Sequence, residues 1–232
     1  MKPKLVVLTG AGISAESGLA TFRAADGLWE GHDVMEVASP EGWRKNPGLV
    51  LEFYNQRRKA ARAAQPNAGH LELAKLEEKF DVTIITQNVD DLHERAGSTN
   101  VIHLHGKLFE SRSTLDPELI YQMESDEIKP GDKCERGSQL RPNIVWFGEA
   151  VPMMEPAMEA TLLADVFAVV GTSLNVYPAA GLVDLAPAEA HIFVIDPSIP
   201  RVQKRPNLHL IEEAATTGVK EMSEALANLS FN

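Results

Sequence analysis

The sequence predicts an α/β protein in which a doubly wound parallel sheet carries a smaller inserted module. Short apolar runs rich in β-branched residues recur along the chain of 232 residues, at residues 5–8, 82–86, 101–105, 167–170 and 192–195. These runs lack the strict alternation of a half-exposed sheet, and helix-like segments separate them, as is typical of parallel strands buried on both faces. Helical periodicity covers residues 47–64, 68–79, 178–186 and 219–229. Asn67 is placed to cap the second of these helices, and Pro178 suits the first turn of the third.

Two stretches interrupt this alternation of strands and helices. Residues 24–47 mix Gly, Pro, Asp and Trp, and residues 108–140 are rich in charge, Pro and Gly. We therefore expect a single domain with two lobes. The large lobe takes approximately residues 1–23, 66–107 and 141–232, and the small lobe takes approximately residues 24–65 and 108–140.

Charge and composition argue against several classes of partner. The formal net charge is −11, so the surface lacks the basic footprint that nucleic acids and anionic membranes require. Acidic fields still attract lysine-bearing peptides. No apolar run reaches the length of a membrane span, and the N-terminus enters a strand almost at once. We expect a cytoplasmic protein, taken to be a monomer, with no nucleic-acid or membrane partner.

A glycine-rich turn follows the first predicted strand. Gly10, Gly12 and Ala15 have the G-x-G-x-x-A spacing that lets a backbone approach a pyrophosphate at a helix N-terminus, although a tight turn without a ligand has the same spacing. A dehydrogenase would need a second strand ending in an acidic residue about twenty residues on. Here "ATFRAADGLWEGHD" contains no strand. Because "TQNVDDLH" and "GTSLNVYP" also follow strands, the three segments predict a dinucleotide site at the carboxyl edge of the sheet.

Six segments together resemble the sirtuins, which are NAD-consuming protein lysine deacylases, and in particular their bacterial class III members. The segments are "GAGISAESGLATFRAADGLW", "FYNQRR", "TQNVDDLHERAG", "VIHLHG", "LRPNIVWFGE" and "GTSLNVYPAA". The resemblance implies a Rossmann-like lobe that binds NAD as co-substrate. It also implies removal of succinyl, malonyl and acetyl groups from lysines of proteins or peptides, giving nicotinamide and O-acyl-ADP-ribose.

The resemblance assigns the catalytic roles to His105 and Asn88. Taken alone, His105 at the end of "VIHLHG" is a core or surface histidine, or half of a metal site with His103. A neutral imidazole at a strand end can accept a proton, and the family makes it the general base toward the ribose hydroxyls. Asn88 and Asp90 would border the nicotinamide pocket, and Gln87 would contact the ribose. From the sequence alone, all three residues could instead simply form a turn.

Further cofactor contacts follow from the resemblance alone. They comprise phosphate and ribose contacts, apolar walls, a loop that covers the reactive carbon, and an adenine contact; the residues are Gly10, Ala11, Gly12, Ile13, Phe22, Arg23, Gly171, Ser173, Asp196 and Ala215. Asp196 is a departure, because many sirtuins have asparagine at the adenosine ribose.

The acyl specificity is predicted from a helix pair. Tyr54 and Arg57 share a helix face, and spacing alone favours a half-buried tyrosine beside a solvated arginine. In class III sirtuins this pair lies at the floor of the acyl pocket, which Ala38 would widen, and a guanidinium can bind a succinyl or malonyl carboxylate. "NIVWFGE" is expected to be a strand with Val145 and Phe147 on one face, which would pair with the substrate backbone.

The family's structural zinc is not expected in this chain. Cys134 is the only cysteine, and residues 108–140 contain no histidine, whereas structural zinc needs about four such ligands. A small helix packing inward is expected to replace the metal, formed by Leu115, Leu119, Ile120, Tyr121 and Met123.

Two other functions remain open: a protein ADP-ribosyltransferase, and a non-catalytic sensor of NAD or ADP-ribose.

Overall fold

The structure is a computed structural model that describes residues 2–20 and 28–231. Phe22 and Arg23, for which the sequence predicts cofactor contacts, lie outside the described residues. Within the described ranges, no helix is both long and apolar enough to span a lipid bilayer.

A six-stranded parallel sheet forms the large part of the molecule, which confirms the predicted fold class. Its strand order is β11-β10-β9-β1-β4-β5. The strands are β1 (Lys4–Thr9), β4 (Asp81–Thr86), β5 (Val101–His103), β9 (Val166–Val170), β10 (His191–Ile195) and β11 (Leu208–Ile211). All of the pairings between them are parallel. The sequence did not predict β11, an edge strand in which Leu210 is 53% exposed, because its apolar run is short and interrupted by a histidine.

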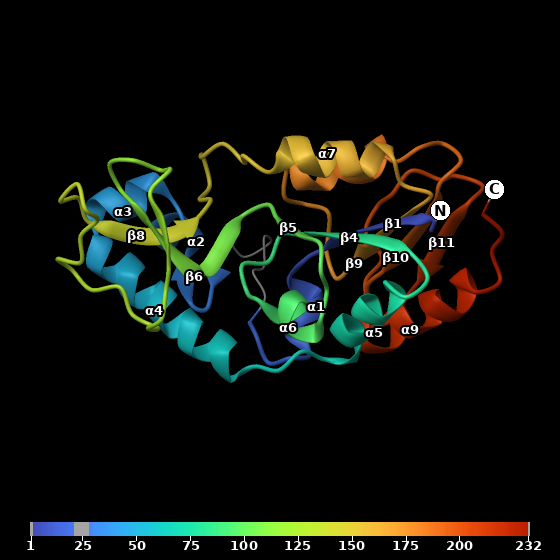
Figure 1. Ribbon diagram of the computed structural model, residues 1–232, viewed down its shortest axis with the longest axis horizontal. Coiled ribbons are helices and arrows are strands. Elements are labelled where there is room, and N and C mark those ends of the chain that lie inside the picture. Colours follow the sequence, from blue (N-terminus) through green and yellow to red (C-terminus); the bar gives the residue numbers. More distant parts are fainter. Residues whose placement is uncertain (1, 21–27, 232) are drawn as a thin grey trace.

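Helices cover both faces of this sheet, which is why its central strands are apolar throughout. Leu5 and Val7 of β1 face a cluster that includes α5 (Ala68–Leu76) and α9 (Ala215–Leu226). Val6 and Leu8 face the opposite cluster, with α7 (Met154–Leu162) and α8 (Leu182–Leu185). Figure 1 shows α7 on one side of the sheet and α5 and α9 on the other.

The predicted helices are present with shifted ends. Asn67 caps α5 as expected, since its side chain accepts a hydrogen bond from the amide of Gly69. The segment predicted at residues 178–186 divides into a 3-10 turn, Ala179–Gly181, and α8. Helix α9 starts four residues earlier than expected, at Ala215, because the threonines of its first turn hide the apolar periodicity.

Apart from the short helices α1 (Ala11–Ala15) and α6 (Leu92–Ala96), the remaining elements lie at the end of the molecule away from both termini (Figure 1). They are β2 (Leu28–Trp29), β3 (His32–Asp33), α2 (Val34–Val37), α3 (Pro40–Lys45), α4 (Pro47–Ala63) and an antiparallel sheet of order β7-β6-β8. Its strands are β6 (Gly106–Ser113), β7 (Ile120–Gln122) and β8 (Leu140–Ile144). A third hydrophobic cluster joins α2 and α4 to β6 and β8 through residues such as Tyr54, Leu108 and Trp146.

The expected small helix in the inserted module is wrong. Residues 120–122 form β7, and Leu115 and Ile120 are 63% and 48% exposed. The module has few apolar residues beyond those that join the third cluster, so polar groups also attach this part of the chain.

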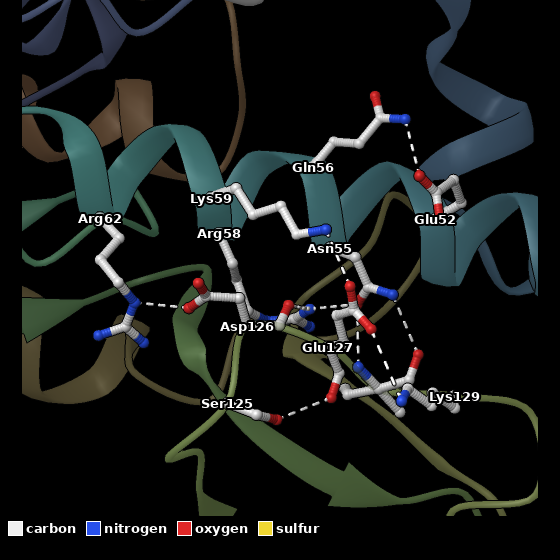
Figure 2. A network of polar contacts seen from close by, with 11 residues as sticks. Glu52, Asn55, Gln56, Arg58, Lys59, Arg62, Ser125, Asp126, Glu127 and Lys129 are labelled. Atoms are coloured by element: carbon white, nitrogen blue, oxygen red, sulfur yellow. Dashed lines mark hydrogen bonds and ion pairs between the residues drawn. The ribbon is translucent and has the colours of Figure 1, made fainter.

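Helix α4 supplies those polar groups (Figure 2). The Nδ2 atom of Asn55 donates to the carbonyl of Ile128 at 3.1 Å, and the amide of Ile128 donates to Oδ1 of Asn55 at 3.0 Å. Arg58 is fully buried and donates through Nε to the carbonyl of Leu108 and through Nη1 to Asn55. Lys59 and Arg62 pair with Glu127 and Asp126 nearer the surface. A buried asparagine and arginine thus fix the module to the helix that carries Tyr54 and Arg57.

Candidate active site at the carboxyl edge of the sheet

One cavity of about 420 Å³ lies where the carboxyl ends of β1, β4, β9 and β10 meet the helices and strands of the smaller part. Sites for small molecules commonly lie at this edge of an open parallel sheet. Most of the residues selected from the sequence line it: Gly10, Ala11, Gly12, Ala38, Tyr54, Arg57, Gln87, Asn88, Asp90, His105, Val145, Phe147, Gly171, Ser173 and Asp196.

Ile13 and Ala215 are not among the residues that line the cavity. Both are buried in the cluster under the sheet. Ala215 packs at the start of α9 against α5, where a Cβ on Gly69 would come within 3.0 Å of the Ala215 carbonyl oxygen. Their contacts with a cofactor stay predictions.

The glycine turn owes its composition to the backbone of a neighbouring loop. Gly10 and Gly12 donate to the carbonyls of Val170 and Gly171 at 3.0 and 2.8 Å. A Cβ on Gly12 would lie 2.6 Å from the Cα of Gly171. Gly171 has φ +63, and a Cβ there would lie 2.4 Å from the amide nitrogen of Ile13. The absence of side chains lets the loops after β1 and β9 touch, and this contact forms one wall of the cavity.

Asn88 and Asp90 are held by Ser14 at the base of the cavity. Asn88 donates through Nδ2 to the carbonyl of Gly10 at 3.0 Å and to Oγ of Ser14 at 3.1 Å. These bonds use both amide hydrogens, so any further hydrogen bond of this side chain is accepted by Oδ1. Burial raises the pKa of Asp90, although the hydrogen bonds from the amide of Leu92 and from Ser14 act in the opposite direction. The cavity base therefore offers an amide oxygen and a desolvated carboxyl group.

His105 is oriented by the backbone of Gln87. Its Nδ1 atom lies 2.9 Å from the Gln87 carbonyl oxygen. A carbonyl only accepts, so Nδ1 carries the hydrogen and Nε2 of the neutral ring keeps its lone pair. Burial lowers the pKa of His105, and the bond to Gln87 opposes that shift. The ring is therefore neutral at neutral pH and can accept a proton through Nε2.

His103 does not join His105. Its Nδ1 and Nε2 atoms lie 3.2 Å from the Asn88 carbonyl oxygen and 2.7 Å from Oε1 of Glu94. Across residues 2–20 and 28–231, no group of three or more His, Cys, Asp or Glu side chains is placed to hold a metal ion. The structure thus gives the alternative of a paired-histidine metal site no support. The lone Cys134 is buried, and its Sγ donates to Oγ of Ser113.

Tyr54 and Arg57 converge on the other end of the cavity. Tyr54 is fully buried, and its hydroxyl accepts a hydrogen bond from Nε1 of Trp146 at 3.2 Å. Burial raises the pKa of Tyr54 to about 12, so the hydroxyl keeps its proton and can donate it. Burial also lowers the pKa of Arg57, which the nearby carboxylate of Glu30 partly offsets. Arg57 is only 10% exposed, so the expectation from spacing alone of a solvated arginine is wrong.

The segment after Ile144 is not a strand, contrary to expectation. The amides of Val145 and Phe147 donate to the carbonyls of His105 and Ala38 at 2.9 and 3.0 Å. The amide of Trp146 donates to Oε2 of Glu149 at 2.8 Å. Those bonds to separate parts of the chain replace the regular ladder of β8. Because these three amides already donate within the chain, a substrate peptide that paired with this segment would have to donate its own amides to the carbonyl groups of the segment.

Several lining residues were not expected from the sequence. Glu149 is bound by Arg141 at 2.7 Å and by Arg112 at 3.2 Å, and it fixes the turn after Trp146. Thr172 accepts from Nε2 of Gln87 at 3.0 Å. Trp29, Glu30 and Tyr177 also line the cavity. For Trp29 and Glu30, the sequence offered one signal of a hairpin turn. Glu30-Gly31 stands between the apolar pair Leu28-Trp29 and the polar pair His32-Asp33, and a glycine between two short segments is typical of such a turn.

Comparison with known proteins gives a consistent result. Residues 10–178 match the Sir2 family. A protein of Helicobacter pylori named NAD-dependent protein deacylase is 52% identical over 226 residues, covering 97% of this chain and 98% of that protein. A protein of the same name from Bacteroides thetaiotaomicron is 51% identical over 227 residues, covering 96% and 97%.

Solved structures agree in fold over nearly the whole chain. The crystal structure of a Sir2 homolog–NAD complex has a TM-score of 0.87 and 41% identity, covering 97% of this chain and 90% of that one. A Sir2–p53 peptide–NAD+ complex has a TM-score of 0.80 and 31% identity, covering 97% and 94%. With this extent of similarity in sequence and fold, the chain belongs to the Sir2 family.

Proposed function

We propose that this protein removes acyl groups from lysine side chains of proteins or peptides with NAD as co-substrate, and that it accepts succinyl and malonyl groups as well as acetyl groups. The observation that carries the proposal is the continuity of one cavity. It is lined by His105 and the strand ends and also by Tyr54 and Arg57. Two substrates can therefore meet in it, one along the sheet edge and one from the side of α4. The relatives named NAD-dependent protein deacylase support the same reaction.

The residues at the strand ends fit NAD by their chemistry. Gly10 to Gly12 and Gly171 present backbone without side chains, while Ser173 and Asp196 offer a hydroxyl and a carboxylate for phosphate and ribose groups. Asn88 and Asp90 would meet the nicotinamide amide. When bound, NAD supplies the ribose carbon that receives the acyl oxygen as nicotinamide leaves. The products of the proposed reaction are free lysine, nicotinamide and O-acyl-ADP-ribose.

His105 would act as the general base of this reaction. With Nδ1 bound to the Gln87 carbonyl, only Nε2 is available to take a proton from a ribose hydroxyl. The depressed pKa of His105 keeps the ring unprotonated at neutral pH. The Gln87 side chain is itself held by Thr172 at 3.0 Å, so the loops after β4 and β9 together set the position of the base.

Arg57 and Tyr54 would select acidic acyl groups. A succinyl or malonyl tail ends in a carboxylate, which a guanidinium and a phenol can both bind, whereas an acetyl methyl group gains nothing from either. The polar groups at this end of the cavity are buried, which strengthens such contacts. Ala38, which is 3% exposed and lines the same cavity, adds little bulk there.

Mass spectrometry of one lysine peptide tests this proposal. The peptide carries acetyl, malonyl or succinyl groups in turn and is incubated with and without NAD, using the wild-type protein, Arg57→Met and the control Arg62→Met. Arg62 lies on the same helix outside the cavity lining and pairs with Asp126. We expect NAD-dependent loss of all three groups, with the acidic ones selectively slowed in Arg57→Met.

Two outcomes would point to the other functions. Nicotinamide release with transfer of ADP-ribose to protein and no acyl loss would indicate an ADP-ribosyltransferase. NAD binding without nicotinamide release would indicate a sensor.

A further inference from the structure

Arg57 already has a carboxylate partner within its own chain. Its Nη1 atom lies 2.8 Å from Oε1 of Glu30, and the two side chains are 10% and 32% exposed. Both residues line the cavity. Glu30 therefore occupies, from inside the molecule, a position on the guanidinium that an acidic acyl group would also seek.

The turn that carries Glu30 does not by itself explain a glutamate there. Glu30 and Gly31 connect β2 to β3 as a two-residue hairpin turn with φ values of +51 and +82. Such turns need positive φ at both positions and favour Asn-Gly. Glutamate is disfavoured in this conformation. The contact that the position gains is the one between its carboxylate and Arg57.

The contact with Glu30 uses only part of the guanidinium. Trp29, from the same hairpin, lies under it, with 4.1 Å between the Arg57 Cζ atom and the ring centroid. Nε of Arg57 is buried and has no hydrogen-bond partner among the described residues. A carboxylate that bound Nε together with one Nη atom would make the two parallel bonds that arginine forms best. A ligand carboxylate that reached Nε would therefore gain a hydrogen bond that Glu30 does not make.

We propose that Glu30 is a specificity-determining residue that competes with the acyl carboxylate of the substrate for Arg57. The inference rests on the proposed function and names a further control on the same site. With Glu30 in place the pair is neutral, and a neutral acyl group enters without disturbing it. A succinyl or malonyl carboxylate must displace Glu30, because two carboxylates this close in a half-buried site repel each other. Glu30, partly exposed on a hairpin turn, can move into solvent.

The competition predicts a change of specificity when the Glu30 carboxylate is removed. In Glu30→Gln, the affinity for a succinyl-lysine peptide should rise about tenfold, because the Glu30 carboxylate no longer opposes the charge-assisted contact between Arg57 and the acyl carboxylate. The affinity for the acetyl-lysine peptide should change less than about twofold. In an Arg57→Met background, Glu30→Gln should have no effect on either peptide, since the competition needs both residues.

Calorimetric titration of the two peptides without NAD measures these affinities directly, and kcat/KM with NAD measures their effect on turnover. Glu36→Gln is the matched control, because Glu36 lies on α2, is exposed and is not in the cavity lining. Glu30→Asn provides a second variant that removes the same carboxylate and suits the turn. A gain in both Glu30 variants and not in Glu36→Gln is the expected result.

An unchanged or reduced ratio of succinyl to acetyl affinity in both Glu30 variants would overturn the proposal, because Glu30 would then orient Arg57 for the substrate. So would failure of the wild-type protein and both variants to bind the succinyl peptide. The peptide titration does not depend on turnover. Absence of acyl loss in the wild type would therefore count against the proposed function alone.

Discussion

The Nδ1 atom of His105 donates its hydrogen to the carbonyl of Gln87, and this hydrogen bond leaves Nε2 as the ring nitrogen that can accept a proton. Replacing His105 with Gln removes the proposed base, and we expect kcat/KM for deacylation to fall by about 100- to 10,000-fold. His209→Gln is the control, since His209 lies on β11 and outside the cavity lining. Equal losses in the two variants would contradict the assignment.

The pH dependence of the same step follows from the depressed pKa of His105. As the proposed base, His105 can accept a proton only when its ring is neutral, so kcat/KM should fall as the pH drops through its folded-state pKa, which lies below the ordinary value of 6.5. We expect more than half of the maximal kcat/KM to remain at pH 6.5. An acid limb with its midpoint above that value, measured with saturating NAD, would show that His105 is not desolvated.

Tyr54→Phe should weaken binding of acidic acyl groups and also destabilise the fold. The change removes a protonated hydroxyl from the cavity and leaves Nε1 of the buried Trp146 without its acceptor. We expect KM for a succinyl peptide to rise about tenfold and the free energy of unfolding to fall by about 1 to 3 kcal/mol. Tyr121→Phe, on β7 outside the cavity, is the control. Urea unfolding and steady-state kinetics separate the two effects, and a rise in KM that was equal for acetyl peptides would argue against the acyl role.

Asn55→Ala should detach the inserted module. Asn55 makes reciprocal hydrogen bonds with the backbone of Ile128 and accepts one from Arg58 (Figure 2), and all these groups are buried. Leaving them unsatisfied should lower the free energy of unfolding by about 2 to 4 kcal/mol. The neighbouring Gln56→Ala removes an exposed bond to Glu52 and should change it by less than about 0.5 kcal/mol. Urea unfolding and limited proteolysis between β7 and β8 would measure the difference. Similar stabilities in the two variants would mean that the module is held by other contacts.

His70 should make the fold less stable in acid. Burial lowers the pKa of His70 to about 4, and the neighbouring His93 is shifted further in the same direction. A depressed histidine pKa means that the folded state prefers the neutral ring. Its stabilising contribution is therefore complete above the ordinary pKa of 6.5 and is lost as the pH falls toward 4. For His70 alone we expect a loss of about 2 kcal/mol between about pH 7.5 and about pH 5.

The His70→Gln variant isolates this contribution. The His70 ring accepts a hydrogen bond from the amide of Asn67 in a capping box, a role that glutamine at the same position can fill. Urea titrations at the two pH values should show a smaller pH dependence in the variant than in the wild type. The same slope in both would mean that other groups titrate in this range.

How far the sequence predicted the fold is clear from the strands. β1, β4, β9 and β10 are buried on both faces, so they are continuous apolar runs, and pattern alone locates them. β6 and β7 were not predicted as strands, and β8 was predicted only at its last two residues, within "NIVWFGE", because these strands are largely polar and half-exposed. In the structure, α4 holds this region through Asn55 and Arg58, which bind backbone groups of Ile128 and Leu108 far away in the chain.

The chain by itself determined the fold class, the family and the residues that lie at the strand ends, because periodicity and local motifs are properties of neighbouring residues. Only the tertiary structure decided which atoms of those residues remain available. The Gln87 carbonyl selects Nε2 of His105, and Trp146 leaves the Tyr54 hydroxyl as a donor. Glu30, 27 positions before Arg57, pairs with the guanidinium. Each of these contacts joins segments that are distant in sequence, and their geometry depends on how the elements pack.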